Sequence, residues 1–488
     1  MSKKPEPQTM EDILKTYLDN IQRGGRDGTS ELEVRFGTAR GMKPITRIES
    51  DNIVQRLLSA GFVKSESQYL LRAKSEFIDP KTGQTKVSNV RAEISGIGNI
   101  MNYCKTNDIE VVSDVQFVQK ARARINSQRG VEQLSTQVEP VDVPDFNFRC
   151  SLNLEKNLTR TQLTKSIISS WKDNKKEFRY INRHTLTHPD FPIQIDISTV
   201  KQSERGKRTY TFDEANLDRI SERHEVEIEV DNFKVGIATE YATPQALNVK
   251  LKRAILLVLS GLQGTNYPVS YPKQDNLLEQ YMKILMGSDY EVKRRVYPRS
   301  FVGPSSVSLQ VNNIAELNED ANIPNIRNDY TVTDKADGDR KLLVVDSSGS
   351  IYLIDTNMNV QFTGARTVNS ELFGSIIDGE HILHDKEGRF INLYAAFDIY
   401  YRAGEDLRTR GFMCKGDDNP NEYRLPLLVQ ALAVLRPSGV SSADSPSPMR
   451  FEAKTFYASS ENQSIFQACG YLMEKVKSGV FEYETDGM

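Results

Sequence analysis

The sequence predicts an α+β protein in which an antiparallel β-barrel with flanking helices precedes a second domain of mixed helices and strands. Two observations support the barrel. Residues 31–36 and 225–230 each alternate acidic and apolar side chains, a pattern typical of strands with one charged and one apolar face. A third observation supports the second domain: Lys335 stands two residues before an Asp-Gly turn, between two β-rich segments.

The composition shows no basic excess and no cysteine framework. Lys and Arg number 63 against 66 Asp and Glu in 488 residues, so any nucleic-acid contact must come from local basic clusters. The four cysteines form no CxxC pair, which argues against a disulfide framework or a zinc site and favours a reducing compartment. The apolar run 254–259 is too short for a bilayer, and the N-terminus has no apolar signal core. We expect a soluble intracellular protein.

Further strands of the N-terminal half repeat the two-faced pattern. In 117–125 the cations fall on one side and the small apolar residues on the other, and 147–155, 176–184 and 193–198 alternate in the same way. For any one strand, an antiparallel sheet with a solvated polar face explains this. The set favours a closed barrel with a charged interior, because adjacent carboxylates repel by roughly 1 kcal/mol at 4 Å in water unless they share a divalent cation. The basic strands would then balance a polyphosphate.

This half resembles the triphosphate tunnel metalloenzymes, specifically the RNA 5′-triphosphatases of fungal and viral capping systems. Glu31 and Glu33 match the first Glu-x-Glu strand of that family, and Glu225, Glu227 and Glu229 cover the last, without showing which two of the three bind metal. The resemblance implies Mg²⁺ or Mn²⁺ at these carboxylates, with Glu31, Glu33, Glu227 and Glu229 catalytic. It further implies that Asp196 orients a cation or a water. It implies phosphate-binding roles for a set of cations: Arg72, Lys74, Arg91, Lys120, Arg122, Arg124, Arg179, Arg183 and Lys201.

Two helices are predicted between the halves. The first begins at Thr243-Pro244 and stops near Gly261 and Gly264, and the second runs from about Asp275 to Met286. We expect both to pack under the barrel, with the boundary near Ser288. The predicted domains are therefore a tunnel domain at 1–240, a helical connection at 241–288 and the second domain at 289–488.

Lys335 is the candidate nucleophile of the second domain. Desolvation among apolar strands can lower the pKa of a lysine, and the neighbouring cation Arg340 lowers it further. A surface turn with an incidental lysine explains the octapeptide 333–340 equally well. What lies downstream therefore decides between the two interpretations.

The downstream order of motifs resembles the covalent nucleotidyltransferases, namely the mRNA capping guanylyltransferases and the polynucleotide ligases. After Lys-x-Asp-Gly at 335–338, segments 376–380, 396–400 and 484–488 match later motifs of that superfamily in order. The resemblance implies an ATP-grasp or ligase-like α+β domain in which Lys335 attacks the α-phosphate of GTP, the substrate, and forms a Lys–GMP adduct. It implies nucleotide-binding roles for Asp337, Gly338, Arg340, Glu380, Phe397, Glu484 and Asp486.

The sequence also departs from that superfamily. It stops at Met488, inside the fourth motif, before the lysine-rich fifth motif and the OB-fold of the relatives. The interpretation is a fragment of a longer capping enzyme, or a chain in which the triphosphatase half works while GMP transfer is weak or absent.

The leading hypothesis is a bifunctional mRNA capping enzyme similar to those of large cytoplasmic DNA viruses. The resemblance implies 5′-triphosphate RNA and GTP as partners, with a methyltransferase region or subunit and RNA polymerase as further ones, and no membrane. It implies a cytoplasmic location, in a viral factory or virion if the chain is viral. Two alternatives stay open: an ATP-dependent polynucleotide ligase, and a non-catalytic scaffold that binds polyphosphate or RNA.

Overall fold

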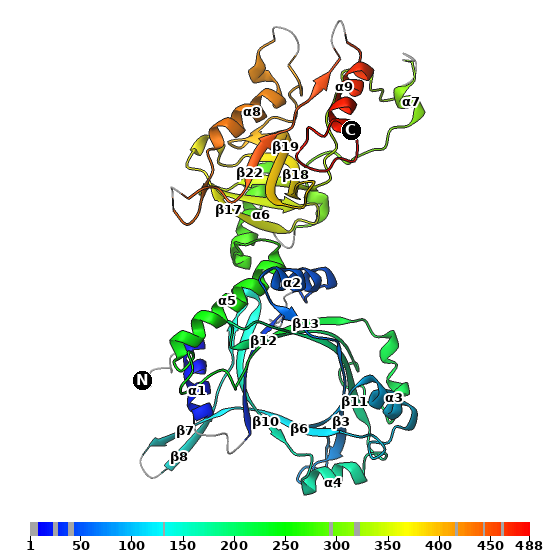
Figure 1. The fold of residues 1–488 in the computed structure, drawn as a ribbon, viewed down its shortest axis with the longest axis vertical. Coiled ribbons are helices and arrows are strands. Elements are labelled where there is room, and N and C mark those ends of the chain that lie inside the picture. Colours follow the sequence, from blue (N-terminus) through cyan, green and yellow to red (C-terminus); the bar gives the residue numbers. More distant parts are fainter. Residues whose placement is uncertain are drawn as a thin grey trace. The chain divides into compact units, whose positions relative to one another are not determined.

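The chain folds into two compact units, Met1–Gly264 and Thr265–Met488, in the computed structural model (Figure 1). The structure describes residues 8–22, 28–37, 43–129, 132–291, 296–316, 323–414, 418–442, 445–459 and 463–488. Within these ranges, no helix combines the length and the apolar character that a membrane crossing requires. Each unit has hydrophobic clusters of its own.

Eight strands of the first unit close into an antiparallel barrel, which Figure 1 views end-on. The ring runs β11, β12, β13, β1, β10, β6, β5 and β3, and β3 pairs back onto β11, so that no edge is left free. The strands of the ring are β1 (Thr29–Phe36), β3 (Gln68–Ile78), β5 (Val90–Ser95), β6 (Gln116–Arg122), β10 (Phe148–Asn157), β11 (Lys176–Thr187), β12 (Ile193–Gln202) and β13 (Arg223–Val230). Short strands extend its margins: β2 (Val63–Lys64), β4 (Thr85–Val87) and β9 (Val141–Val143).

The pairing register gathers the charged faces inside the ring. Glu33 of β1 pairs with Ser151 of β10 and with Glu229 of β13, and paired residues of neighbouring strands face the same side of a sheet. The alternate residues Leu32 and Val34 are buried in the core outside the ring. The predicted barrel with a charged interior and an apolar exterior is therefore confirmed.

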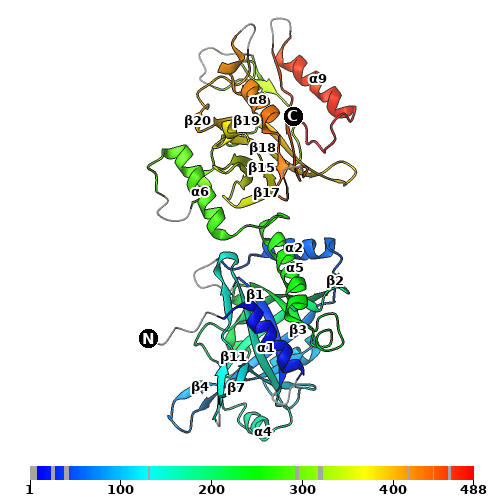
Figure 2. The same ribbon diagram turned by 90° about the vertical axis from the view of Figure 1, so that its left-hand side faces the viewer.

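Helices cover the outside of the barrel (Figure 2). α1 (Met10–Gln22), α2 (Arg47–Ser59) and α5 (Pro244–Gln263) share one core with β1, β10, β12 and β13. α3 (Ile97–Thr106) and α4 (Gln162–Ser169) flank a second core, which contains Trp171. Outside the ring, β7 (Arg124–Arg129) and β8 (Glu132–Gln137) form a separate hairpin.

The predicted helical connection is correct for its first helix and wrong for its second. The Thr243 side chain caps α5 by accepting from the Ala246 N–H, and α5 ends at Gly264 with φ 62°, a conformation that glycine adopts without strain. α6 (Tyr271–Met286) instead buries Leu277 and Tyr281 in a core of the second unit. The units divide at Gly264 and not near Ser288, because the apolar stripe of α6 fits the sheet that follows it in the chain.

The second unit is built on a mixed sheet with one core on each face. The strand order is β20, β19, β18, β15, β16, β17, β21, and β22 joins β19 in parallel. α6 covers one face and α8 (Arg424–Leu435) the other. The remaining elements are α7 (Val311–Ile314), α9 (Ile465–Lys477), β14 (Thr331–Val332), β15 (Asp339–Val345), β16 (Ser350–Asp355), β17 (Val360–Arg366), β18 (Ile376–His384), β19 (Phe390–Arg402), β20 (Glu405–Asp406), β21 (Ser438–Gly439), β22 (Arg450–Ala453) and β23 (Tyr457–Ala458). Short 3-10 turns occupy Pro144–Phe146, Asp213–Ala215, Leu217–Arg219, Pro298–Ser300, Ser370–Leu372 and Pro420–Glu422.

The close contact of α2 with α5 depends on Gly261, and this can be tested. A Cβ at Gly261 would lie 2.6 Å from the Cα of Ile53, so we expect Gly261→Ala to destabilise the first unit by about 1–3 kcal/mol. The matched control is Gly98→Ala in α3, where a Cβ meets open space and the change should be neutral or slightly stabilising. Urea unfolding followed by the fluorescence of Trp171, the single tryptophan, reports this unit, and equal midpoints for both variants would contradict the expectation.

Candidate active site

Glu31 and Glu33 of β1 share one cation inside the ring. Lys120 Nζ on β6 lies 2.5 Å from Glu31 Oε2 and 2.8 Å from Glu33 Oε2. The other oxygen of Glu33 accepts hydrogen bonds from Ser151 Oγ at 3.0 Å and from Asn153 Nδ2 at 3.1 Å. Burial raises the pKa of Glu31 to about 7, against the opposing effect of Lys120 and with a further contribution from the charge of Glu33.

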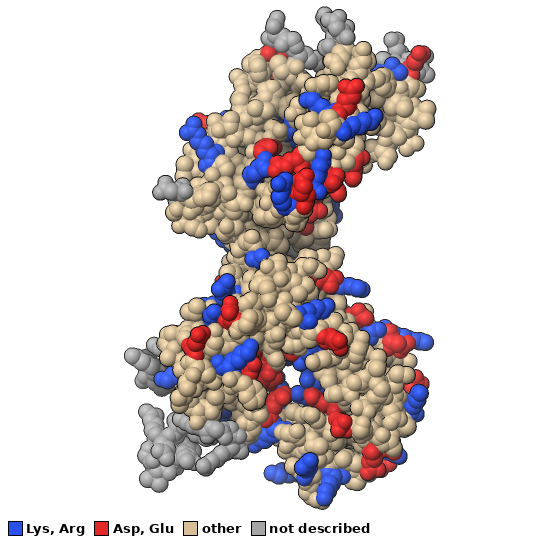
Figure 3. Space-filling view, in the orientation of Figure 1, with Lys and Arg blue, Asp and Glu red and all other residues tan. Residues whose placement is uncertain are grey.

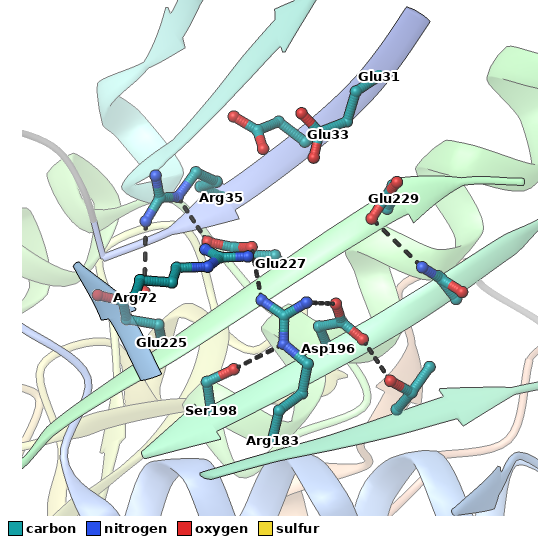
Figure 4. Close-up of polar contacts among 12 residues, drawn as sticks. Glu31, Glu33, Arg35, Arg72, Arg183, Asp196, Ser198, Glu225, Glu227 and Glu229 are labelled. Carbon is teal, nitrogen blue, oxygen red and sulfur yellow. Dashed lines mark hydrogen bonds and ion pairs between the residues drawn. The ribbon is translucent and has the colours of Figure 1, made fainter. Parts of the chain in front are cut away.

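Two carboxylates of β13 are held by arginines (Figure 4). Glu225 forms ion pairs with Arg35 at 3.4 Å and with Arg179. Glu227 lies 2.9 Å from Arg35 Nε and 3.7 Å from Arg183 Nη2. Burial favours the neutral acid, but these two arginines lower the pKa of Glu227 below its ordinary value. Arg35 therefore joins both carboxylates, a contact that sequence reasoning did not assign although Arg35 lies on the charged face of β1.

Glu229 differs from the other carboxylates of β13. In the part of the chain that the structure describes, its carboxylate has a hydrogen bond from Gln194 Nε2 at 3.2 Å and no ion pair. Burial and the charge of Asp196 raise the pKa of Glu229. Glu229 is also the register partner of Glu33, so the two side chains face the interior from neighbouring positions.

The donor chemistry of the interior suits a hard divalent cation. Carboxylate oxygens are the ligands that Mg²⁺ and Mn²⁺ prefer, and burial, together with nearby carboxylates, raises the pKa of Glu31 and of Glu229. No three acidic, histidine or cysteine side chains converge as a metal cage within the described ranges. Glu31, Glu33 and Glu229 therefore fit such an ion by ligand type, whereas Glu225 and Glu227 are engaged by arginines.

The other cations of the ring form a continuous ionic lining. Arg72 Nε lies 2.8 Å from Glu93 Oε1, and Arg91 pairs with both Glu93 and Glu155. Glu93 and Glu155 had not been singled out from the sequence, although their alternation with apolar neighbours places them on the charged face. The register puts these predicted cations inside the ring: Arg72, Lys74, Arg91, Lys120, Arg122, Arg179 and Arg183.

A charged rim surrounds an opening through the first unit in the space-filling view (Figure 3). Arg183 Nη1 lies 2.7 Å from Asp196 Oδ2, and Thr185 Oγ1 donates to the other oxygen of Asp196 at 2.6 Å. Asp196 therefore orients Arg183, as the sequence suggested, and is itself only 2% exposed. The arrangement can hold a polyanion between arginines that carboxylates keep in place.

Two predicted phosphate ligands lie elsewhere. Lys201 pairs in register with Tyr180 on the outer face of the sheet, and its Nζ donates to the backbone oxygen of Asp218 at 3.1 Å. Lys201 has the same odd numbering as the apolar residues 193, 195 and 197 of β12, and alternate residues of a strand share one face. The sequence alone could therefore have placed Lys201 outside the barrel. Arg124 also lies outside the ring, since β6 ends at Arg122 and Arg124 begins the separate β7–β8 hairpin.

The lysine motif and the last motif of the chain come together in the second unit. Lys335 N donates to Gly487 O at 2.9 Å, Asp337 N to Glu484 O at 3.0 Å, and Asp486 N to Lys335 O at 2.8 Å. This short antiparallel pairing joins segments about 150 residues apart and puts Asp486 Oδ2 2.8 Å from Lys335 Nζ.

The pKa of Lys335 runs opposite to the sequence expectation. Its side chain is 57% exposed, so little desolvation acts on it. The hydrogen bond to Asp486 raises the pKa of Lys335 above its ordinary value, although desolvation opposes the shift. The expectation was wrong because the chain places Lys335 on an open turn against a carboxylate, and not among apolar side chains. Arg340 is engaged by Asp378.

Arg340 is clamped by a buried aspartate. Its Nε and Nη2 lie 3.2 and 2.6 Å from the two oxygens of Asp378, which is fully buried. Tyr400 donates to Asp378 at 2.6 Å, and Arg340 Nη1 donates to Pro304 O at 2.7 Å. A guanidinium held by this many partners has a structural role, because it is not free to extend toward a ligand.

Phe397 stands in a β-bulge. Asp378 pairs with Asp398 while Gly379 pairs with Ala396, which leaves Phe397 as the extra residue of β19. Bulges redirect side chains, and the Phe397 ring lies 5.9 Å from the Arg340 guanidinium, with Phe301 at 5.4 Å.

Lys454 is a site residue that sequence reasoning missed. Buried beside the motif, its Nζ donates to Asp334 O at 2.5 Å and lies 3.4 Å from Glu380 Oε2. Burial raises the pKa of Glu380, and Lys454 opposes that shift. Tyr483 donates to Asp334 at 3.0 Å. No spacing links residues 334, 380, 454 and 483, so only the fold could reveal this cluster.

A family model matches part of the second unit and the end of the first. Residues 262–469 match the family model described as mRNA capping enzyme, catalytic domain. The family match begins two residues before the boundary between the units, which supports the division at Gly264.

Among curated relatives, a probable mRNA-capping enzyme of Acanthamoeba polyphaga mimivirus is 29% identical over 234 residues. The match covers 47% of this chain and 16% of the relative, so the chain spans a small part of that protein.

Solved structures resemble about half of the chain. The mimivirus capping enzyme triphosphatase is 17% identical, with a TM-score of 0.30, over 51% of this chain and 94% of that one. The S. pombe RNA triphosphatase is 14% identical, with a TM-score of 0.29, over 51% of this chain and 92% of that one. Because these TM-scores are low, the barrel is assigned from the closed pairing of its strands and not from the similarity to solved structures.

The burial of Glu31 predicts how stability depends on pH. Its pKa is about 7 in the folded protein against 4.5 for an ordinary glutamate, so the folded state holds a proton that the unfolded state releases. Stability contributed by this group therefore falls as pH rises from about 4.5 to about 7. In EDTA at pH 8, Glu31→Gln should stabilise the first unit by on the order of 2–3 kcal/mol, and the gain should vanish near pH 5.

Urea midpoints of the Trp171 signal measured at both pH values test this. Glu139→Gln is the control, since Glu139 is 64% exposed in its pair with Arg122. A Glu31→Gln effect that is independent of pH would contradict the raised pKa.

Proposed function

We propose that the chain is a bifunctional mRNA capping enzyme. The first unit removes the γ-phosphate from 5′-triphosphate RNA, and the second transfers GMP from GTP to the diphosphate end. The observation that carries the proposal is the tunnel lining, in which the carboxylates of β1 and β13 face a band of arginines and lysines inside one closed ring. The capping-enzyme match of 262–469 supports the second half.

In the tunnel, the chain's own residues bind and orient the triphosphate. Arg72, Arg179 and Arg183 neutralise phosphate oxygens, and Glu93, Glu225 and Asp196 fix those guanidinium groups before the substrate arrives. Glu31, Glu33 and Glu229 would hold a divalent cation, Mg²⁺ or Mn²⁺. Such an ion would neutralise charge that develops on the phosphoryl oxygens. Lys120, which lies 2.5 Å from Glu31 Oε2 and 2.8 Å from Glu33 Oε2, adds a positive charge beside these carboxylates for the phosphate.

In the second unit, Lys335 is the nucleophile. After its proton leaves, Nζ forms a bond to the α-phosphorus of GTP while the bond from phosphorus to pyrophosphate breaks. The GMP then passes to the diphosphate end of the RNA, which releases Lys335. Lys454 and Glu380 hold the turn of the lysine motif in place. Phe397 supplies an aromatic face on which the nucleobase stacks. The residues that border the nucleotide are Asp337, Gly338, Glu484 and Asp486.

The triphosphatase half is tested by phosphate release from 5′-triphosphate RNA with Mg²⁺ or Mn²⁺. We expect Glu33→Ala to lower release at least about 100-fold, since it removes a carboxylate with three polar contacts, to Lys120, Ser151 and Asn153, inside the ring. Glu110→Ala, an exposed glutamate outside the ring, is the matched control. Undiminished release by Glu33→Ala would contradict the tunnel assignment.

The Lys335 half is tested by covalent labelling with α-labelled GTP, with ATP in parallel to detect a ligase. Lys335→Arg should abolish the adduct. Because Asp486 raises the pKa of Lys335, Asp486→Asn should move the rising limb of the pH profile for adduct formation to lower pH. Glu474→Gln is the matched control with an exposed side chain in α9, and an equal shift in both variants would remove the special role of Asp486.

A further inference from the structure

One end of the tunnel opens into a cavity of 570 Å³ whose lining is mostly neutral and polar. This volume lies within the range of about 300–1,000 Å³ typical of small-molecule sites. β2, the start of β3, and facing parts of β11 and β12 supply the neutral lining: Val63, Ser65, Gln68, Thr185, Thr187 and Gln194. Three charged residues complete it: Lys64 of β2, and Arg183 and Asp196 of the ionic lining.

The rim of this cavity is fixed by strand pairing. Val63 of β2 pairs with Thr187 of β11, Ser65 N donates to Thr185 O at 2.8 Å, and Thr185 N donates to Ser65 Oγ at 3.0 Å. Val63 is 67% exposed, so an apolar surface lies beside hydroxyl and amide groups. Such a combination suits a flat, uncharged group with polar edges.

The cavity adjoins the charged residues assigned to the triphosphate. Arg183 and Asp196 form an ion pair at its wall, and Gln194 donates to Glu229, which faces Glu33 (Figure 4). A molecule seated here is therefore next to both the phosphate-binding cations and the carboxylates of β1 and β13.

The opposite end of the same strands is ionic. β3 begins at Gln68 in the cavity, and further along it Lys74 pairs in register with Glu177. Beyond Lys74, Glu76 forms an ion pair with Arg208 at 3.0 Å, and Asp79 pairs with Lys86. Among the residues that the structure describes, the first end lines an open volume with neutral hydrogen-bonding groups, whereas Glu76 and Asp79 at the other end form ion pairs.

We propose that the cavity is the subsite for the first nucleoside of the RNA, so that the RNA chain enters and leaves the tunnel through this end. The proposal rests on the proposed triphosphatase function and adds the direction of substrate entry. Gln68 and Thr187 bond to the sugar or the base edge, Val63 packs against the base, and Arg183 meets the phosphate nearest the nucleoside. Hydroxyl and amide groups suit these uncharged parts, whereas arginines suit the phosphates.

The test compares two ligands that share the triphosphate but not the nucleoside. Equilibrium binding of a 5′-triphosphate RNA oligonucleotide and of inorganic tripolyphosphate is measured in EDTA, and KM for both is measured with Mg²⁺ or Mn²⁺. The unaltered chain should bind the RNA more tightly. Gln68→Ala/Thr187→Ala should weaken RNA binding about 10-fold, as expected for two lost hydrogen bonds, and tripolyphosphate binding less than about twofold.

The matched control is Gln84→Ala/Thr85→Ala, which changes exposed residues of the same types at the other end of β3 and should leave both ligands unaffected. Equal weakening of both ligands by the cavity variant, loss of RNA binding in the control variant alone, or equal binding of the two ligands by the unaltered chain would each overturn the subsite. Failure of the proposed function is seen separately, as no phosphate release by the unaltered chain with either metal.

Discussion

The charged interior of the first unit depends on mutual neutralisation inside a closed ring. Charges taken out of water are costly unless each meets an opposite charge with good geometry, and removing one partner of a buried pair typically costs 3–5 kcal/mol. Lys120 forms ion pairs with both Glu31 and Glu33, and Arg35 forms them with Glu225 and Glu227. Glu93 pairs with Arg72 and Arg91. Each strand of the ring therefore constrains its neighbours through its side chains as well as through its backbone.

The same constraint makes the tunnel receptive to its proposed ligands. Glu31 and Glu229 retain raised pKa values, so their surroundings can accept more positive charge. The arginines are already oriented by carboxylates, so a triphosphate meets a site that loses little conformational freedom on binding. Because buried charges lose hydration, a charged interior stabilises the folded state less than an apolar interior of the same size. In return, the interior is already arranged to bind phosphate and a metal ion.

In the second unit one buried carboxylate has the comparable role. Asp378 is fully buried and is satisfied by Arg340 and Tyr400, which fixes the strand beside the lysine motif. Lys335 itself remains open and paired with Asp486, because its turn is held by backbone hydrogen bonds to the last residues of the chain. Rigid support is thereby combined with an exposed side chain at the proposed nucleophile.

The sequence alone determined the two-domain α+β fold, the barrel and most of its lining, because a period of two along a strand decides which face a residue occupies. The sequence also identified the lysine motif at 335–338, because the later motifs at 376–380, 396–400 and 484–488 follow it in the expected order. Only the tertiary structure decided that α6 packs on the second unit, that Lys201 and Arg124 lie outside the ring, and that Lys454 lies beneath the motif. An apolar stripe shows that one face of a helix is buried, but it does not show which element packs against that face. Contacts between residues far apart in the chain leave no local pattern in the sequence. These outcomes therefore depend on tertiary packing.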